Sequence, residues 1–235
     1  MGRRWFYFAL LSLGAFGPRS AYAQSAERAP DTMEARVMAC APCHGANGEG
    51  TSNAYFPRLA GKPAGYLANQ LLAFHTGRRH YPPMNYLLEY LSEDYLKKIA
   101  DYFAAQRPPL PPPMVPDVSN EVLARGESIV AHGDAAAGVP ACSSCHGPHL
   151  TGMEPAIPGL LGLRASYISA QLGAWRYGTR TATAPDCMQI VAGHLTEDDV
   201  KAIAAFLASR PAPSDLSPSP AGTFVLPFAC GSEPQ

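Results

Sequence analysis

The sequence predicts a mainly α-helical protein that is built from two similar halves. The motif C-x-x-C-H occurs at residues 40–44 and again 102 residues later, at 142–146. The segments that follow the two motifs also match, which indicates an internal repeat. No long stretch alternates apolar and polar residues with the period of two that half-buried strands show. The 24 prolines and 21 glycines favour short helices separated by turns over long bundles.

The two halves correspond over most of their length. Residues 57–61 (P-R-L-A-G) correspond to 158–162 (P-G-L-L-G), and residues 91–94 (L-S-E-D) correspond to 195–198 (L-T-E-D). The offset drifts from 101 to 104, as a duplicated domain with insertions in its loops should show. We therefore expect the same helices in each half.

Local signals set the bounds of these helices. Ser92 and Thr196 are good N-caps for the closing helix of each half, and acidic residues follow both of them. Prolines at 108 and 211 end these helices. Helices are expected over 31–39, 63–74 and from Ser92 to 105 in the first half, and over 122–131 and from Thr196 to 209 in the second.

The first 23 residues have the pattern of a secretory signal peptide. Arg3 and Arg4 precede a short apolar run, residues 5–16, and residues 21–23 (A-Y-A) form a small-x-small cleavage site. The apolar run is shorter than the about 20 residues that a membrane-spanning helix needs. Cleavage after Ala23 is therefore favoured over retention as an anchor, and the chain is expected to be exported.

The charge pattern argues against nucleic-acid partners. The chain has 18 basic and 19 acidic residues, so its formal net charge is −1. It contains no run of Lys and Arg that could neutralise phosphates. We expect no nucleic acid among the partners.

Four of the six cysteines lie in the C-x-x-C-H motifs. In an exported chain, three disulfides would be the simplest alternative. The paired thiols of this motif can instead add to the two vinyl groups of haem, and the adjacent His then lies where a ring nitrogen binds iron. A lone C-x-x-C could be a redox dithiol, part of a zinc site or a disulfide, whereas His follows both pairs here. The sequence thus predicts two covalently attached haem c groups, at Cys40, Cys43, Cys142 and Cys145, with His44 and His146 as axial ligands.

A methionine at matching positions of both halves is the expected second axial ligand. Met84 and Met188 lie 40 and 42 residues after their His, and we expect each on a loop over the other haem face. A thioether is a soft ligand for haem iron and raises the reduction potential. Core packing is the commoner use of Met, but the paired positions favour ligation. The rivals, none with a counterpart of its own kind, are His75, His80, His149, His194, Met114 and Met153.

A proline-rich segment divides the two halves. Six prolines lie in residues 108–118, and such a segment is stiff and extended. We therefore expect it to hold two haem domains at a fixed separation. The predicted organisation is a signal peptide (1–23), a first domain (24–107), a linker (108–118), a second domain (119–211) and a C-terminal tail (212–235).

Together these features resemble a known family. Two class I cytochrome c domains in tandem, with C-x-x-C-H-G, a P-x-L-x-G segment and a late Met, resemble the bacterial di-haem cytochromes of the c-four type. The resemblance covers about residues 32–211. It implies two small α domains, a periplasmic location, and electron transfer to a terminal oxidase or reductase. It also assigns haem attachment and iron ligation to the Cys, His and Met residues named above.

Two cysteines and one inserted stretch depart from this pattern. Cys187 lies beside Met188, and the tail adds Cys230. A disulfide between them would pin the tail near the second haem, although two free thiols or an intermolecular bond remain alternatives. Residues 132–140 are an insertion before the second motif.

Two arginines, Arg79 and Arg180, occupy equivalent positions in the repeat. Because Arg binds carboxylates with a fork of two N–H donors, they could pair with haem propionates. Ordinary surface charges are an equal alternative.

The expected function is electron transfer without a reaction of the protein's own. Two six-coordinate haems leave no open position for a substrate, so no catalytic residue is predicted. The alternatives are a cytochrome subunit of a dehydrogenase complex, associated with a membrane complex through its partners, and a di-haem peroxidase-like enzyme. A peroxidase-like enzyme requires a haem iron with an open coordination position. Because Cys187 is next to the predicted ligand Met188, the second haem is the candidate for such an iron.

Overall fold

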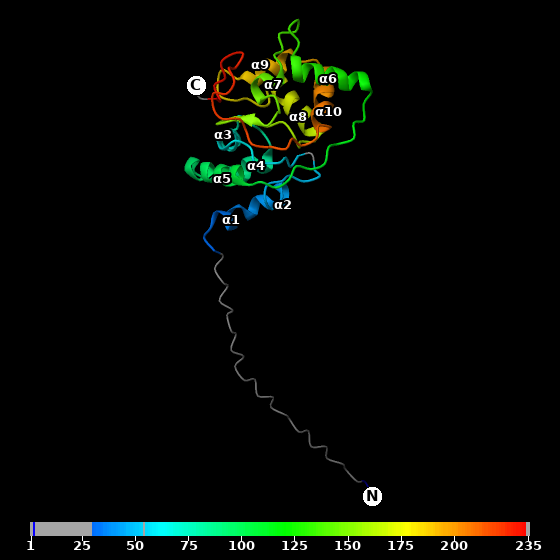
Figure 1. Cartoon of the computed structure of the whole chain (residues 1–235). Coiled ribbons are helices and arrows are strands. Elements are labelled where there is room, and N and C mark those ends of the chain that lie inside the picture. The colour runs from blue at the N-terminus through cyan, green and yellow to red at the C-terminus, as the bar shows by residue number, and fades with distance from the viewer. Residues whose placement is uncertain (1, 3–29, 54, 234–235) are drawn as a thin grey trace. The chain divides into compact units, whose positions relative to one another are not determined.

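The computed structural model describes residues 2, 30–53 and 55–233, and Asp31–Gln235 form one compact unit (Figure 1). Except for Gly2, the predicted signal peptide lies outside the described residues. Helices dominate the described part of the chain, so the predicted mainly α fold is confirmed. Across those residues, no helix is both long and apolar enough to cross a membrane.

The first repeat consists of short helices around one longer pair. Its elements are α1 (Met33–Arg36), the 3₁₀ helix η1 (Val37–Cys40), α2 (Ala41–His44), α3 (Ala64–His75), α4 (Pro82–Leu88) and α5 (Glu93–Ala105). The Ser92 hydroxyl accepts a hydrogen bond from the backbone N–H of Tyr95, as an N-cap should. The helix predicted over 31–39 is divided, because the chain tightens into a 3₁₀ turn at Val37.

The second repeat has the same order with one small hairpin added. Its elements are α6 (Asn120–His132), α7 (Cys142–His146), β1 (Gly152–Met153), β2 (Ile157–Pro158), α8 (Ala165–Arg176), α9 (Cys187–His194) and α10 (Glu197–Ala208). Strands β1 and β2 pair antiparallel, with Met153 opposite Ile157. Each has two residues, too few to produce the alternation by which strands are recognised.

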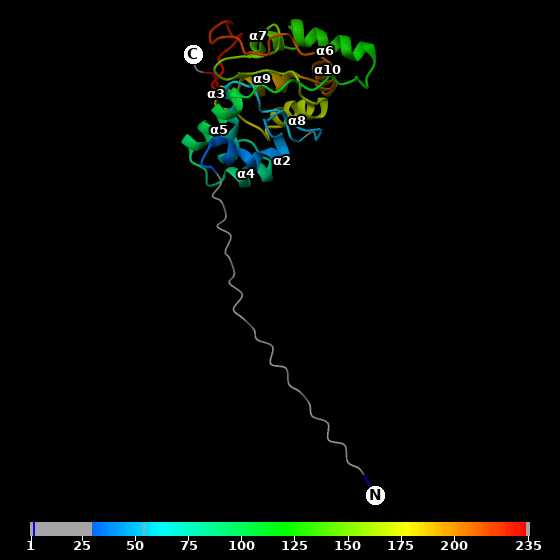
Figure 2. The same ribbon diagram turned by 60° about the horizontal axis from the view of Figure 1, so that its bottom comes forward.

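Each repeat has a core of its own. In the first, α3 packs on α5 through Leu67, Ile99 and Phe103. In the second, α6 and α10 lie side by side in both views (Figures 1 and 2). Gly126 on α6 permits this close approach, because a Cβ there would lie 2.2 Å from the carbonyl oxygen of Ala202.

The proline-rich segment is bound to both repeats. Arg58 of the first repeat donates hydrogen bonds to the carbonyl oxygens of Pro108 and Pro109. The backbone N–H of Met114 donates to the carbonyl oxygen of Ala208 in α10, at 2.9 Å. The repeats also contact each other directly, as described below. The domain bounds given above stay predictions.

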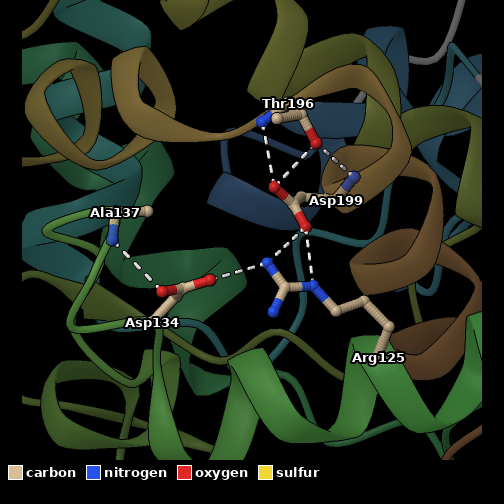
Figure 3. A network of polar contacts seen from close by, with 5 residues as sticks. All are labelled: Arg125, Asp134, Ala137, Thr196 and Asp199. Carbon is tan, nitrogen blue, oxygen red and sulfur yellow. Dashed lines mark hydrogen bonds and ion pairs between the residues drawn. The ribbon is translucent and has the colours of Figure 1, made fainter.

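A charged network joins α6 to the start of α10 (Figure 3). The Arg125 guanidinium lies 2.8 Å from carboxylate oxygens of both Asp134 and Asp199. Asp199 also accepts from the hydroxyl and backbone N–H of Thr196, which completes a capping box at the start of α10. Burial acts to raise the pKa of Asp199, but the hydrogen bonds from Thr196 and Arg125 outweigh it and hold the pKa below its ordinary value.

We expect Asp199→Ala to destabilise the second repeat by about 1–2 kcal/mol, since it removes the N3 half of the capping box as well as one of the two carboxylate partners of Arg125. The measurement is thermal unfolding of the holoprotein followed by circular dichroism. Asp198→Ala is the matched control, because it removes an exposed carboxylate from the same turn of α10. An equal loss in both variants would show that charge near the helix end, and not the capping geometry, is responsible.

Candidate haem sites

The second repeat contains a cavity of about 180 Å³. Its wall includes all four residues predicted to hold the second haem: Cys142, Cys145, His146 and Met188. The remaining wall is mainly apolar and comes from α6, α8, α9, α10, the C-terminal tail, loops of the second repeat and three residues of the first repeat, Lys62, Tyr66 and Gln70. The fold thus brings together four residues that are separated by up to 46 positions in the sequence.

Helix α7 sets the geometry of the haem motif. It is a single turn in which Cys142 and Cys145 are three residues apart and His146 follows, so all three share one face. The Nδ1 atom of His146 lies 2.7 Å from the carbonyl oxygen of Pro158. A carbonyl oxygen only accepts, so Nδ1 carries the proton and Nε2 keeps a lone pair for a metal. Burial lowers the pKa of His146, which keeps the imidazole neutral as ligation requires.

Met188 lies on a helix and not on the loop that the sequence suggested. Asp186 caps α9, because its carboxylate accepts from the backbone N–H groups of Gln189 and Ala182. In the first repeat, prolines at the start of α4 likewise begin a helix that contains Met84. Both short helices begin at residues that favour helix starts, which the sequence analysis did not use.

The first repeat has the same contact between its motif histidine and a proline carbonyl. The Nδ1 atom of His44 lies 2.8 Å from the carbonyl oxygen of Pro57, and His44 is buried. Cys40 packs beside the cluster formed by α3 and α5, and Met84 packs against the neighbouring cluster around Phe74. Leu71 and Leu91 contact both clusters.

Burial of the thiols argues against a redox dithiol. Burial raises the pKa of Cys142 to about 12 and also raises the pKa values of Cys40 and Cys145. A redox-active C-x-x-C pair needs a thiol whose pKa is lowered. Neutral thiols beside a large apolar cavity instead suit covalent attachment of an apolar group.

The rival ligands do not line the second-repeat cavity, and several are bound or exposed. The Nδ1 atom of His75 lies 2.9 Å from the carbonyl oxygen of Leu88, and Met153 is paired within the hairpin core. His80, His149 and His194 are exposed. None of the rivals is among the described residues that line the second-repeat cavity.

Two equivalent arginines meet where the repeats touch. The Arg79 guanidinium donates to Oε1 of Gln70, to the hydroxyl of Tyr167 and to Oε1 of Gln171. The Arg180 guanidinium donates to the same two amide oxygens, at 2.8 Å from Gln171 and 2.6 Å from Gln70. These five residues form the interface cluster, in which the two arginines and the two glutamines are pairs related by the repeat. Arg180 is 3% exposed, and burial, then the charge of Arg79, lower its pKa to about 10.

The cavity fits a group that combines a large apolar surface with carboxylates. No carboxylate pairs with Arg79 or Arg180 among the described residues. The buried Nε1–H donor of Trp175, which also lines the cavity, has no hydrogen-bond partner there. Free haem would supply an apolar macrocycle, two propionates and two vinyl groups, and addition of the two thiols across those vinyl groups would give haem c. The residues present therefore fit haem c.

The C-terminal tail forms part of the second cavity. It lies beside α7 in both views, where it is coloured red (Figures 1 and 2). Leu226, Phe228 and Cys230 line the cavity. Cys230 is bonded to Cys187, next to Met188, with 5.0 Å between the two Cα atoms. The Glu233 carboxylate accepts from the backbone N–H of Ala156 at 3.0 Å, which holds the end of the tail.

The family model for cytochrome c matches residues 34–106 and 124–211, and so covers both repeats. This chain belongs to the cytochrome c family. It is 37% identical to a thiosulfate dehydrogenase electron acceptor of Thiomonas intermedia, over 78% of this chain and 82% of that protein. It is 35% identical to cytochrome c4 of Pseudomonas aeruginosa, over 84% of this chain and 94% of that protein.

Solved structures agree with this assignment. Cytochrome c4 from Pseudomonas stutzeri matches with a TM-score of 0.66 and 30% identity, over 75% of this chain and 96% of that chain. The thiosulfate dehydrogenase TsdBA from Marichromatium purpuratum also matches with a TM-score of 0.66, at 36% identity, over 73% of this chain and 36% of that chain. The protein is therefore a di-haem cytochrome of the c4 type, with two covalently attached haem c groups, and it transfers electrons.

Sequence reasoning missed three features of the sites. Lys62 of the first repeat lines the cavity of the second, a placement for which the sequence has no signal. The tail was recognised only through Cys230, although Leu226 and Phe228 also line the cavity. Gln70 and Gln171 were visible as equivalent residues of the repeat, but their shared contact was not.

We expect the C-terminal tail to detach from the second repeat more often in the double variant Cys187→Ser/Cys230→Ser. Chymotrypsin should then cleave after Phe224 and Phe228 faster than in the wild type, because the covalent link that limits local opening is gone. Cleavage is followed by mass spectrometry. Cleavage in the linker near Met114 is the internal control and should not change. Equal cleavage of the tail in both proteins would mean that the noncovalent contacts alone hold it.

Proposed function

We propose that this chain is a periplasmic electron carrier with no catalytic reaction of its own. In this proposal Cys40, Cys43, Cys142 and Cys145 attach the haems, and His44, Met84, His146 and Met188 are the axial ligands. The observation that carries it is the second-repeat cavity, in which two neutral thiols, an oriented neutral imidazole and a thioether face one space. This arrangement supports a low-spin haem in the second repeat, and the matching motif with its contact between His44 and Pro57 supports another in the first.

The residues of the chain prepare each site for rapid one-electron transfer. Haem iron supplies the chemistry by cycling between its ferric and ferrous states. The carbonyl oxygens of Pro57 and Pro158 fix the tautomer and orientation of His44 and His146. The Met thioethers favour the reduced state. The interface cluster holds the repeats in contact and so shortens the distance that an electron travels between the haems.

A second function is favoured by the relatives. Two of them are named as electron acceptors of thiosulfate dehydrogenase, and a third is a thiosulfate dehydrogenase whose chain is matched over 36% of its length. We propose that this chain accepts electrons from a dehydrogenase of that class and passes them to a terminal oxidase or reductase. A peroxidase-like reaction is the less favoured alternative. It needs an iron with an open coordination position, whereas Met188 lines the second-repeat cavity and is available to fill that position.

The carrier function is tested by counting haems in the mature protein. We expect two haems per chain in a pyridine haemochrome assay, and one in each of the variants Cys40→Ala/Cys43→Ala and Cys142→Ala/Cys145→Ala. Near-infrared absorption from Met–Fe(III) ligation should have full intensity for two sites in the wild type. One haem per wild-type chain, or carbon monoxide binding by the reduced protein, would contradict two six-coordinate haems.

The dehydrogenase function predicts direct reduction by that enzyme. Catalytic amounts of purified thiosulfate dehydrogenase with thiosulfate should reduce both haems of the oxidised chain without a chemical mediator, as followed by stopped-flow absorbance. Thiosulfate without the enzyme is the control for direct chemical reduction. If the enzyme reduces an artificial acceptor but leaves this chain oxidised, the specific partner is wrong and the general carrier function stands.

A further inference from the structure

Lys62 is a buried cation that one repeat contributes to the cavity of the other. It lies just before α3 of the first repeat, yet it lines the second-repeat cavity and is 9% exposed. Its ammonium donates a hydrogen bond to the carbonyl oxygen of Gly159, at 2.8 Å. Gly159 follows Pro158, whose carbonyl oxygen binds Nδ1 of His146. The ammonium is thus next to the segment that orients the predicted iron ligand.

The positive charge of Lys62 has no carboxylate partner among the described residues. Two carboxylates line the same cavity, but each is bound elsewhere. Asp186 caps α9, and Glu233 accepts from the backbone N–H of Ala156. Burial lowers the pKa of Lys62 to about 8, so the ammonium form still prevails at neutral pH. A buried cation without a counter-charge is costly, which indicates that the bound group supplies the negative charge.

The charge is specific to one of the two sites. At the repeat offset of 101 residues, Lys62 corresponds to Leu163, an apolar residue on the wall of the same cavity. The second repeat therefore has no equivalent lysine to offer the first haem site.

We propose that Lys62 is a positioning residue of the second haem, which it binds across the boundary between the repeats, and that its charge raises the reduction potential of that haem. The inference rests on the proposed attachment of a haem to the second motif. A reduced haem carries one more negative charge than an oxidised one, so a nearby buried cation favours reduction. Docking of the two repeats thereby sets the potential of the second haem.

The test is potentiometric titration of the two-haem holoprotein, in which each haem gives a separate midpoint. Lys62→Gln keeps a donor for the Gly159 carbonyl but removes the charge. One midpoint potential should fall by the amount that corresponds to an about tenfold smaller equilibrium constant for reduction. That is about 59 mV for a one-electron couple. The other midpoint should not move. Lys62→Met, which keeps the length of the side chain, is the second variant and should show the same fall.

Two controls separate charge from structure. Lys62→Arg retains the charge and should keep both midpoints near the wild-type values. Lys97→Gln removes a lysine charge from α5, where the side chain is 63% exposed, and should shift neither midpoint. Two haems with Met ligation and unchanged midpoints in Lys62→Gln would overturn the role of Lys62 and leave the carrier function intact. A wild-type chain with one haem would overturn both.

Discussion

The contact between the repeats depends on two cations, the buried Arg180 and the half-buried Arg79, that share two amide oxygens. Arg79 and Arg180 each donate to both Gln70 and Gln171. Each guanidinium therefore has one hydrogen-bond acceptor in its own repeat and one in the other repeat. Because a buried guanidinium without acceptors is costly, this arrangement constrains how the repeats meet. The two backbones also meet at these residues, because Arg79 and Arg180 form an isolated antiparallel β-bridge.

This constraint places residues of one repeat in the site of the other. With the interface cluster formed, Lys62 reaches the second-repeat cavity, and Tyr66 and Gln70 line it as well. The second site is therefore built from two repeats and the tail, whereas its sequence motif lies in one repeat alone. The two haems of such a protein share a motif but not an environment, and their potentials are free to differ.

The tail adds a second source of asymmetry. The bond between Cys187 and Cys230 links the tail to the turn of chain that contains Met188, and Glu233 fastens its end to Ala156. Apolar tail residues then complete the wall of the second cavity. The wall of the second site therefore includes tail residues that have no counterpart in the first repeat.

The sequence by itself determined the repeat, the helical class and the residues able to bind haem, because each rests on local spacing. C-x-x-C-H places two thiols and an imidazole on one helical turn, and Ser92 and Thr196 cap their helices through contacts three residues away. Only the tertiary structure decided that Lys62 contacts Gly159 across 97 residues and lines the cavity of the other repeat. Such contacts depend on how separate elements pack, and a single chain's spacing carries no record of that packing.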